Sequence, residues 1–248
     1  MKCSLHSTQG RYAVKMRNDA VTPNRLFLAA LRPTLSEVAL PQEAAAMAAY
    51  MKSSMPFLGV SCPTVRKSVR ALAKEHPFTG VEQLGATVVQ LWAGAEFREE
   101  RYAAIMLTDS RLARGQMRLL PFYAGVVETG QWWDYVDSVA PRLCELLQAH
   151  RDVMDPLLRA WSTHANFWFR RAAIIAQLPA KESTDTGLLH QVIAANLGDT
   201  EFFIRKAIGW ALRQYAKTDP DWVRDFVTRH GGQLSPLSRR EALKHLDG

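Results

Sequence analysis

FWFRRAA at residues 167–173 recurs as FFIRKAI at residues 202–208. The two strings are 35 residues apart (202 − 167), and Trp132 lies the same distance before Phe167 (167 − 132). Each of the three starting aromatic residues is followed directly by a second one, and Phe97 lies one further period upstream without a second one. A period of about 20–50 residues in a helical chain indicates helix pairs that stack on one another.

The rest of the chain supports a helical architecture. From about residue 25 onward, apolar residues recur at helical spacing, as in PTVRKSVRALAKEH (63–76), and the breaks fall at Pro, Gly, Asn and Asp. The break at Pro141 makes PRLCELLQAH (141–150) a separate predicted helix. No stretch alternates as a strand would. The tetratricopeptide order W-x-x-L-G-x-x-Y is absent, so a HEAT-like pair fits the period better.

The predicted fold is therefore all-α, a solenoid of stacked antiparallel helix pairs with a concave basic groove. We expect one domain over residues 25–248, preceded by a poorly ordered N-terminal extension at residues 1–24, which are polar and irregular.

Composition indicates the kind of partner. The 248 residues contain 31 Lys and Arg against 24 Asp and Glu, for a net charge of +7 and a pI near 9.5. Such a balance favours an anionic partner, either nucleic acid or an acidic membrane surface. No apolar run reaches the roughly 18 residues that a membrane span needs, and no secretory signal is recognisable. We expect a cytoplasmic protein.

Metal and redox chemistry have no motif in this sequence. Cys3, Cys62 and Cys144 are odd in number and far apart, and neither a zinc spacing nor an HExxH pattern occurs. The cysteines are therefore expected to be reduced thiols, and neither a metal nor a cofactor is expected.

QWWDYVDS at residues 131–138 carries the strongest chemical signal. In a helix, Trp133 and Asp137 lie four residues apart and share a face. An aromatic ring beside a carboxylate suits a cation, or a sugar that is becoming one. The alternative is structural, with two buried aromatic residues at a helix start and Asp134 or Asp137 serving as a cap or an ion-pair partner.

Cationic residues occupy matching places in the next two repeats. Basic side chains supply phosphate contacts and aromatic rings stack on bases or sugars, so these positions are candidate DNA contacts. On the last of these helices, cation, aromatic and cation recur at spacings of four and three residues. The alternative is a solvated helix face with its tryptophan turned inward. The residues concerned are Arg170, Arg171, Arg205, Lys206, Trp210 and Arg213.

These strings resemble the HEAT-like-repeat DNA alkylation-repair glycosylases, the AlkD family. The similarity covers roughly residues 44–246, in family order, and excludes residues 1–40. The matching segments are AAYMKSSMPFLGVSCPTVRK (48–67), QLWAGAEFREERYAAI (90–105), QWWDYVDSVAP (131–141), NFWFRRAAI (166–174), EFFIRKAIGWALRQYAKTDPDWV (201–223) and LSPLSRREALKH (234–245).

The resemblance implies cleavage of the N-glycosidic bond of N3- or N7-alkylated purines in duplex DNA, by a monomer without a cofactor. Asp137 matches the family's catalytic carboxylate, and Trp133 and Trp210 match its two tryptophans at the lesion. Arg171 matches an arginine that contacts the DNA backbone, and Tyr50 matches an aromatic residue lining the same groove.

One departure and two rival functions remain at this stage. Tyr135 occupies a slot that looks smaller and polar in the family, and is expected to narrow the groove. A non-catalytic protein that binds damaged DNA would keep the cations without needing Asp137 and both tryptophans. A helical scaffold for another protein would lack salt-dependent affinity for DNA.

Overall fold

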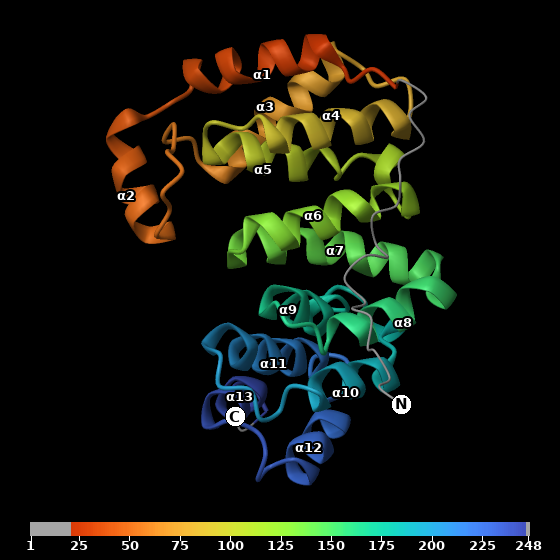
Figure 1. The fold of residues 1–248 in the computed structure, drawn as a ribbon. Helices are drawn as coiled ribbons and strands as arrows, with labels where there is room; N and C mark the ends of the chain where they lie inside the picture. Colours follow the sequence, from red (N-terminus) through yellow and green to blue (C-terminus); the bar gives the residue numbers. More distant parts are fainter. Residues whose placement is uncertain (1–20, 247–248) are drawn as a thin grey trace, which may run out of the picture. The chain divides into compact units, whose positions relative to one another are not determined.

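The computed structural model describes residues 21–246, and within that range every regular element is helical. Thirteen α-helices and three short 3₁₀ helices account for these elements, and no strand occurs among the described residues. The all-α prediction is confirmed. The chain divides into two compact units, one ending at Phe122 and the other beginning at Tyr123, and Figure 1 shows the helices of each.

Unit 1 contains the first five helices. The preceding Asn24 is buried, accepts from the backbone N–H of Phe27 and donates to the carbonyl of His76, so the folded part of the chain includes this residue. The extension predicted at residues 1–24 otherwise falls mostly outside the described residues and stays a prediction. The helices are α1 (Arg25–Glu37), α2 (Pro41–Met51), α3 (Cys62–Glu75), α4 (Val81–Ala93) and α5 (Arg98–Leu107).

A buried carboxylate fixes the loop between α2 and α3. Glu99, with no exposed surface, accepts hydrogen bonds from the backbone N–H groups of Leu58, Gly59 and Val60. Three backbone donors satisfy a charge whose burial alone would be costly. The first turn of α5 thus anchors the segment that follows α2.

In unit 2, alternate helices pack side by side in a row. α7 packs on α9, α9 on α11 and α11 on α13, while α8, α10 and α12 each pack against members of this row. The helices are α6 (Leu120–Gly130), which begins three residues before the unit, α7 (Trp133–Ala149), α8 (Arg151–Trp161), α9 (Phe167–Ile175), α10 (Thr186–Ala194), α11 (Phe202–Tyr215), α12 (Pro220–Arg229) and α13 (Pro236–Leu243).

The 35-residue period marks where helices begin. Phe97 and Trp132 are the N-caps of α5 and α7, and Phe167 and Phe202 are the first residues of α9 and α11. In unit 2, the aromatic residues at the starts of α7, α9 and α11 contact one another. This arrangement confirms that the sequence period reflects a structural repeat.

The separate helix predicted from Pro141 is wrong, because α7 continues through this residue to Ala149. A proline inside a helix has no N–H to give to the carbonyl four residues earlier, and its ring crowds that carbonyl. The affected carbonyl is that of Asp137. Leu143, Cys144 and Leu146, which follow Pro141 in the helix, are buried. Their burial offsets this cost, so the helix continues past the proline.

Among residues 21–246, no helix combines the length and the apolar character needed to cross a bilayer.

Gly209 lets α13 approach α11 closely. A Cβ added at Gly209 would lie 2.5 Å from the Cβ of Glu241 and 3.0 Å from the carbonyl oxygen of Ser238. We therefore expect Gly209→Ala to destabilise the protein by about 1–3 kcal/mol despite the better helix propensity of alanine. Chemical denaturation measures this change.

Gly125 in α6 is the matched control, because no atom of residues 21–246 outside its chain neighbours and its own helix backbone lies within 4 Å of the Cβ that alanine would add there. Gly125→Ala should be neutral or stabilising. Equal unfolding free energies for the two variants would show that α11 and α13 tolerate a larger separation.

Candidate active site

Asp137 and Arg171 form the central ion pair of unit 2. The Nε and Nη2 atoms of Arg171 each donate to a different carboxylate oxygen of Asp137, both at 2.8 Å. Nη1 of the same guanidinium donates to the backbone carbonyl of Phe203 at 2.6 Å. α9 thus supplies an arginine that links α7 to the first turn of α11. Such two-pronged pairing fixes the orientation of the carboxylate as well as its position.

The pair is largely withdrawn from solvent. The side chain of Arg171 is 6% exposed and that of Asp137 is 17% exposed. Burial raises the pKa of the Asp137 carboxyl above its ordinary value, Arg171 opposes this rise, and the nearby Asp134 adds to it. The carboxylate is the more exposed member of the pair, so it is the member that a developing positive charge can approach.

Aromatic rings gather where α7, α9 and α11 begin. The ring centroid of Trp132 lies 6.2 Å from that of Trp168 and 5.6 Å from that of Phe203, and the latter two are 5.0 Å apart. These distances suit tilted and edge-on aromatic packing, which stabilises a fold beyond simple burial. The Phe203 ring also lies under the guanidinium of Arg171, 5.9 Å from it. The cluster therefore supports the ion pair from one side.

The two tryptophans of the WW pair have different surroundings. Trp132 joins the aromatic cluster, whereas Trp133 begins α7 and is half-buried, four residues before Asp137 on the same helix. The predicted sharing of one face by Trp133 and Asp137 follows from this helix. Tyr135 has no exposed surface, so the expectation that it narrows a groove is wrong. Its position in α7 turns it into the core instead.

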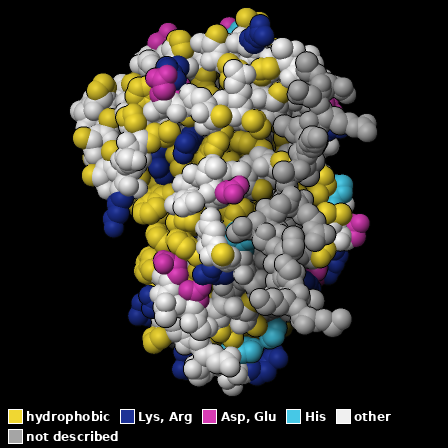
Figure 2. All heavy atoms as spheres, viewed as in Figure 1, with side chains coloured by type: hydrophobic (Ala, Val, Ile, Leu, Met, Phe, Trp, Pro, Cys, Tyr) yellow, Lys and Arg dark blue, Asp and Glu magenta, His cyan; other side chains and the backbone are white. Residues whose placement is uncertain are grey.

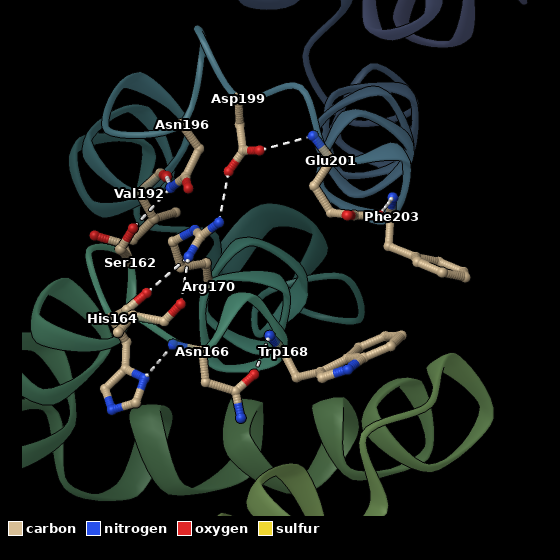
Figure 3. A network of polar contacts seen from close by, with 11 residues as sticks. Ser162, His164, Asn166, Trp168, Arg170, Val192, Asn196, Asp199, Glu201 and Phe203 are labelled. Carbon is tan, nitrogen blue, oxygen red and sulfur yellow. Dashed lines mark hydrogen bonds and ion pairs between the residues drawn. The ribbon is translucent and has the colours of Figure 1, made fainter.

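Arg170 is engaged in holding two turns together. It donates to the carbonyls of His164 and Ala165, at 2.8 and 3.2 Å, and pairs with the carboxylate of Asp199 at 2.8 Å (Figure 3). The other oxygen of Asp199 accepts from the backbone N–H of Glu201, which is the N-cap of α11. The prediction that Arg170 contacts DNA stays untested, and its present contacts set the start of α11.

The predicted cation–aromatic–cation face of α11 also has an acidic partner. Lys206 lies 3.2 Å from Glu241 of α13, and Arg213 pairs with the other oxygen of that carboxylate. Trp210, between the two cations in the sequence, is half-buried. Arg205 is also half-buried, and no hydrogen-bond partner for its Nε is present among the described residues.

Side chains of both charges lie on unit 2. On the face visible in Figure 2, Lys and Arg side chains lie beside Asp and Glu side chains. Most of the cations predicted to contact DNA pair with acidic side chains, and the predicted basic groove remains a prediction. Tyr50 belongs to unit 1, where it lies on α2 with 75% of its surface exposed.

Sequence reasoning missed the groups that hold the predicted site residues in place. These groups are the backbone carbonyl of Phe203 and the carboxylates of Asp199 and Glu241. The acidic residue in PLSRREALKH was visible in the sequence, but its pairing depends on the register between α11 and α13. Within residues 21–246, no three His, Cys, Asp or Glu side chains are grouped closely enough to hold a metal ion.

Comparison with known proteins identifies the family. The chain matches the family model described as DNA alkylation repair enzyme over residues 31–246. A solved structure of a predicted DNA alkylation repair enzyme from Enterococcus faecalis is 35% identical, with a TM-score of 0.75 over 84% of this chain and 96% of the other. The structure of smu.31 from Streptococcus mutans UA159 shares the fold, at 17% identity and a TM-score of 0.56 over 73% of this chain and 98% of the other. A search of curated proteins found no match. The chain belongs to the DNA alkylation repair enzyme family.

Proposed function

We propose that this protein is a DNA glycosylase that hydrolyses the N-glycosidic bond of cationic N3- and N7-alkylated purines in duplex DNA. The observation that carries the proposal is the carboxylate of Asp137, held by two hydrogen bonds from Arg171 on the helix that begins with Trp133. It acts as a monomer without a cofactor, on DNA in the cytoplasm.

The chemistry follows from the charge of the lesion. An alkylated purine is already cationic, so the C–N bond can break with both electrons going to the base, which leaves as a neutral molecule. The sugar then develops oxocarbenium character, and a fixed carboxylate stabilises that positive charge or aligns the attacking water. Asp137 supplies this carboxylate. Burial strengthens its interaction with a nearby cation, because less water screens the charge.

The remaining site residues have supporting roles in this proposal. Arg171 holds the carboxylate of Asp137 in one orientation, and its two remaining N–H groups are those that could reach a DNA phosphate. Trp133 and Trp210 present aromatic faces to the cationic nucleotide. The other proposed DNA contacts, which provide phosphate or stacking interactions, are Tyr50, Arg170, Arg205, Lys206 and Arg213.

Selectivity for charged lesions tests the proposal. No side chain is assigned as a general acid, so a neutral damaged base would have to leave without a proton. We expect release of 7-methylguanine from duplex DNA and no release of the neutral O6-methylguanine, measured by chromatography of free bases. Equal rates for the two lesions would contradict this mechanism.

A second function, binding of damaged DNA without catalysis, is favoured by one observation. Both oxygens of Asp137 already accept hydrogen bonds from Arg171, as in a purely structural ion pair. This function predicts tighter binding to alkylated than to unmodified duplex, without base release. Binding and release measured on the same lesion therefore separate the two functions.

A further inference from the structure

Two cations flank Trp210 on α11, and both pair with one carboxylate. Lys206 and Arg213 lie four residues before and three residues after the tryptophan, which places all three on one helix face. Lys206 approaches one oxygen of Glu241, at 3.2 Å, and Arg213 approaches the other. Glu241 thus links the two ends of this face from the neighbouring helix.

The position of Glu241 is fixed by close packing of α13 on α11. Ser238, one turn earlier on α13, donates to the carbonyl of Arg205 at 2.9 Å. Gly209 removes the Cβ that would otherwise collide with Glu241. The backbone of Glu241 is therefore held close to the cations while the two helices stay together.

Burial and charge act in opposite directions on this carboxylate. Burial raises the pKa of Glu241, but Lys206 and Arg213 outweigh it, so the pKa lies below its ordinary value. The side chain is 15% exposed, whereas Lys206 and Arg213 are 38% and 24% exposed. The cations reach solvent more than the anion that they bind.

The geometry points to a phosphate site on α11 whose anion position is occupied by Glu241 in the absence of DNA. A phosphate offers anionic oxygens to two cations just as a carboxylate does, and side chains exposed to solvent can turn toward it. On binding, Lys206 and Arg213 transfer from Glu241 to the DNA backbone next to Trp210. Glu241 positions both cations and weakens affinity by competing for them. This inference rests on the proposed function, because it takes duplex DNA as the partner.

Removal of the charge of Glu241 tests the exchange. Glu241→Gln keeps the shape of the side chain, and we expect it to bind a short unmodified duplex about three- to tenfold more tightly than wild type, as when two partly exposed ion pairs no longer need to be broken. Fluorescence anisotropy at several salt concentrations measures this affinity. Glu128→Gln in α6 is the control, because Glu128 is exposed and the substitution changes the net charge equally.

Lys206→Gln provides a second measurement if Glu241→Gln proves unstable in a melting curve. The exchange predicts weaker binding and a salt slope smaller by about 0.9, the value for one lost phosphate contact. Unchanged affinity for Lys206→Gln, or no tightening of Glu241→Gln beyond the Glu128→Gln control, would overturn the inference alone. Absence of any duplex binding by wild type would overturn it together with the proposed function.

Discussion

Replacement of Asp137 with asparagine is expected to lower the single-turnover rate of 7-methylguanine release by about 10²- to 10³-fold. Asparagine has nearly the same shape but no charge, so it cannot stabilise a positive sugar. Affinity for the alkylated duplex should stay within a few-fold of wild type. Rates measured with enzyme in excess over DNA isolate the chemical step from product release.

Asp134→Asn is the matched control for this prediction. Asp134 lies on the same helix, one turn earlier, and accepts a hydrogen bond from the backbone N–H of Tyr135 at 2.9 Å. Its substitution should leave the rate within about threefold of wild type, as expected for a group outside the reaction. Comparable losses in both variants would indicate a general effect of charge in α7, and wild-type activity in Asp137→Asn would remove this carboxylate from the mechanism.

Replacement of Arg171 with glutamine is expected to have the largest effect on stability. The substitution leaves the carboxylate of Asp137 buried without its partner and the carbonyl of Phe203 without its donor. Loss of one member of a buried pair costs about 3–5 kcal/mol, which a denaturation curve resolves. Arg170→Gln is the control on the same helix. It also removes the charge of a paired arginine, but the partner of this arginine is Asp199 and not Asp137.

The loss of stability in Arg171→Gln should depend on pH in a defined direction. Burial already raises the pKa of Asp137 and Arg171 opposes the rise, so removal of Arg171 moves this pKa higher. As pH falls through the raised pKa, protonation removes the unpaired charge, and the variant should regain stability relative to wild type. Base release should be lost over the same range, at a higher pH than in wild type. A stability difference that is constant with pH would contradict an unpaired Asp137 charge as its cause.

The fold was predictable because its determinants are local and repeated. The period that relates Trp132, Phe167 and Phe202 marks the starts of α7, α9 and α11, and hydrophobic spacing identifies the helices between them. The helix end predicted at Pro141 was wrong, because burial of the residues around the proline outweighs its local tendency to break a helix.

The site was predictable in its residues but not in their pairing. Trp133 and Asp137 follow from spacing within one helix, whereas the pairing of Asp137 with Arg171 depends on how α7 and α9 are offset. Tyr135 shows the same limit, because helix rotation decides whether a residue next to an aspartate faces solvent or the core. Interhelical register is a tertiary property, and a single sequence does not encode it in any short string.

Release of free base from a duplex containing a single N7-methylguanine tests the central claim most directly. Wild-type protein is expected to release 7-methylguanine, leave an abasic site and leave an unmodified duplex intact. Binding of the alkylated duplex without any release of free base would contradict the assignment of a glycosylase and leave a damage-binding protein.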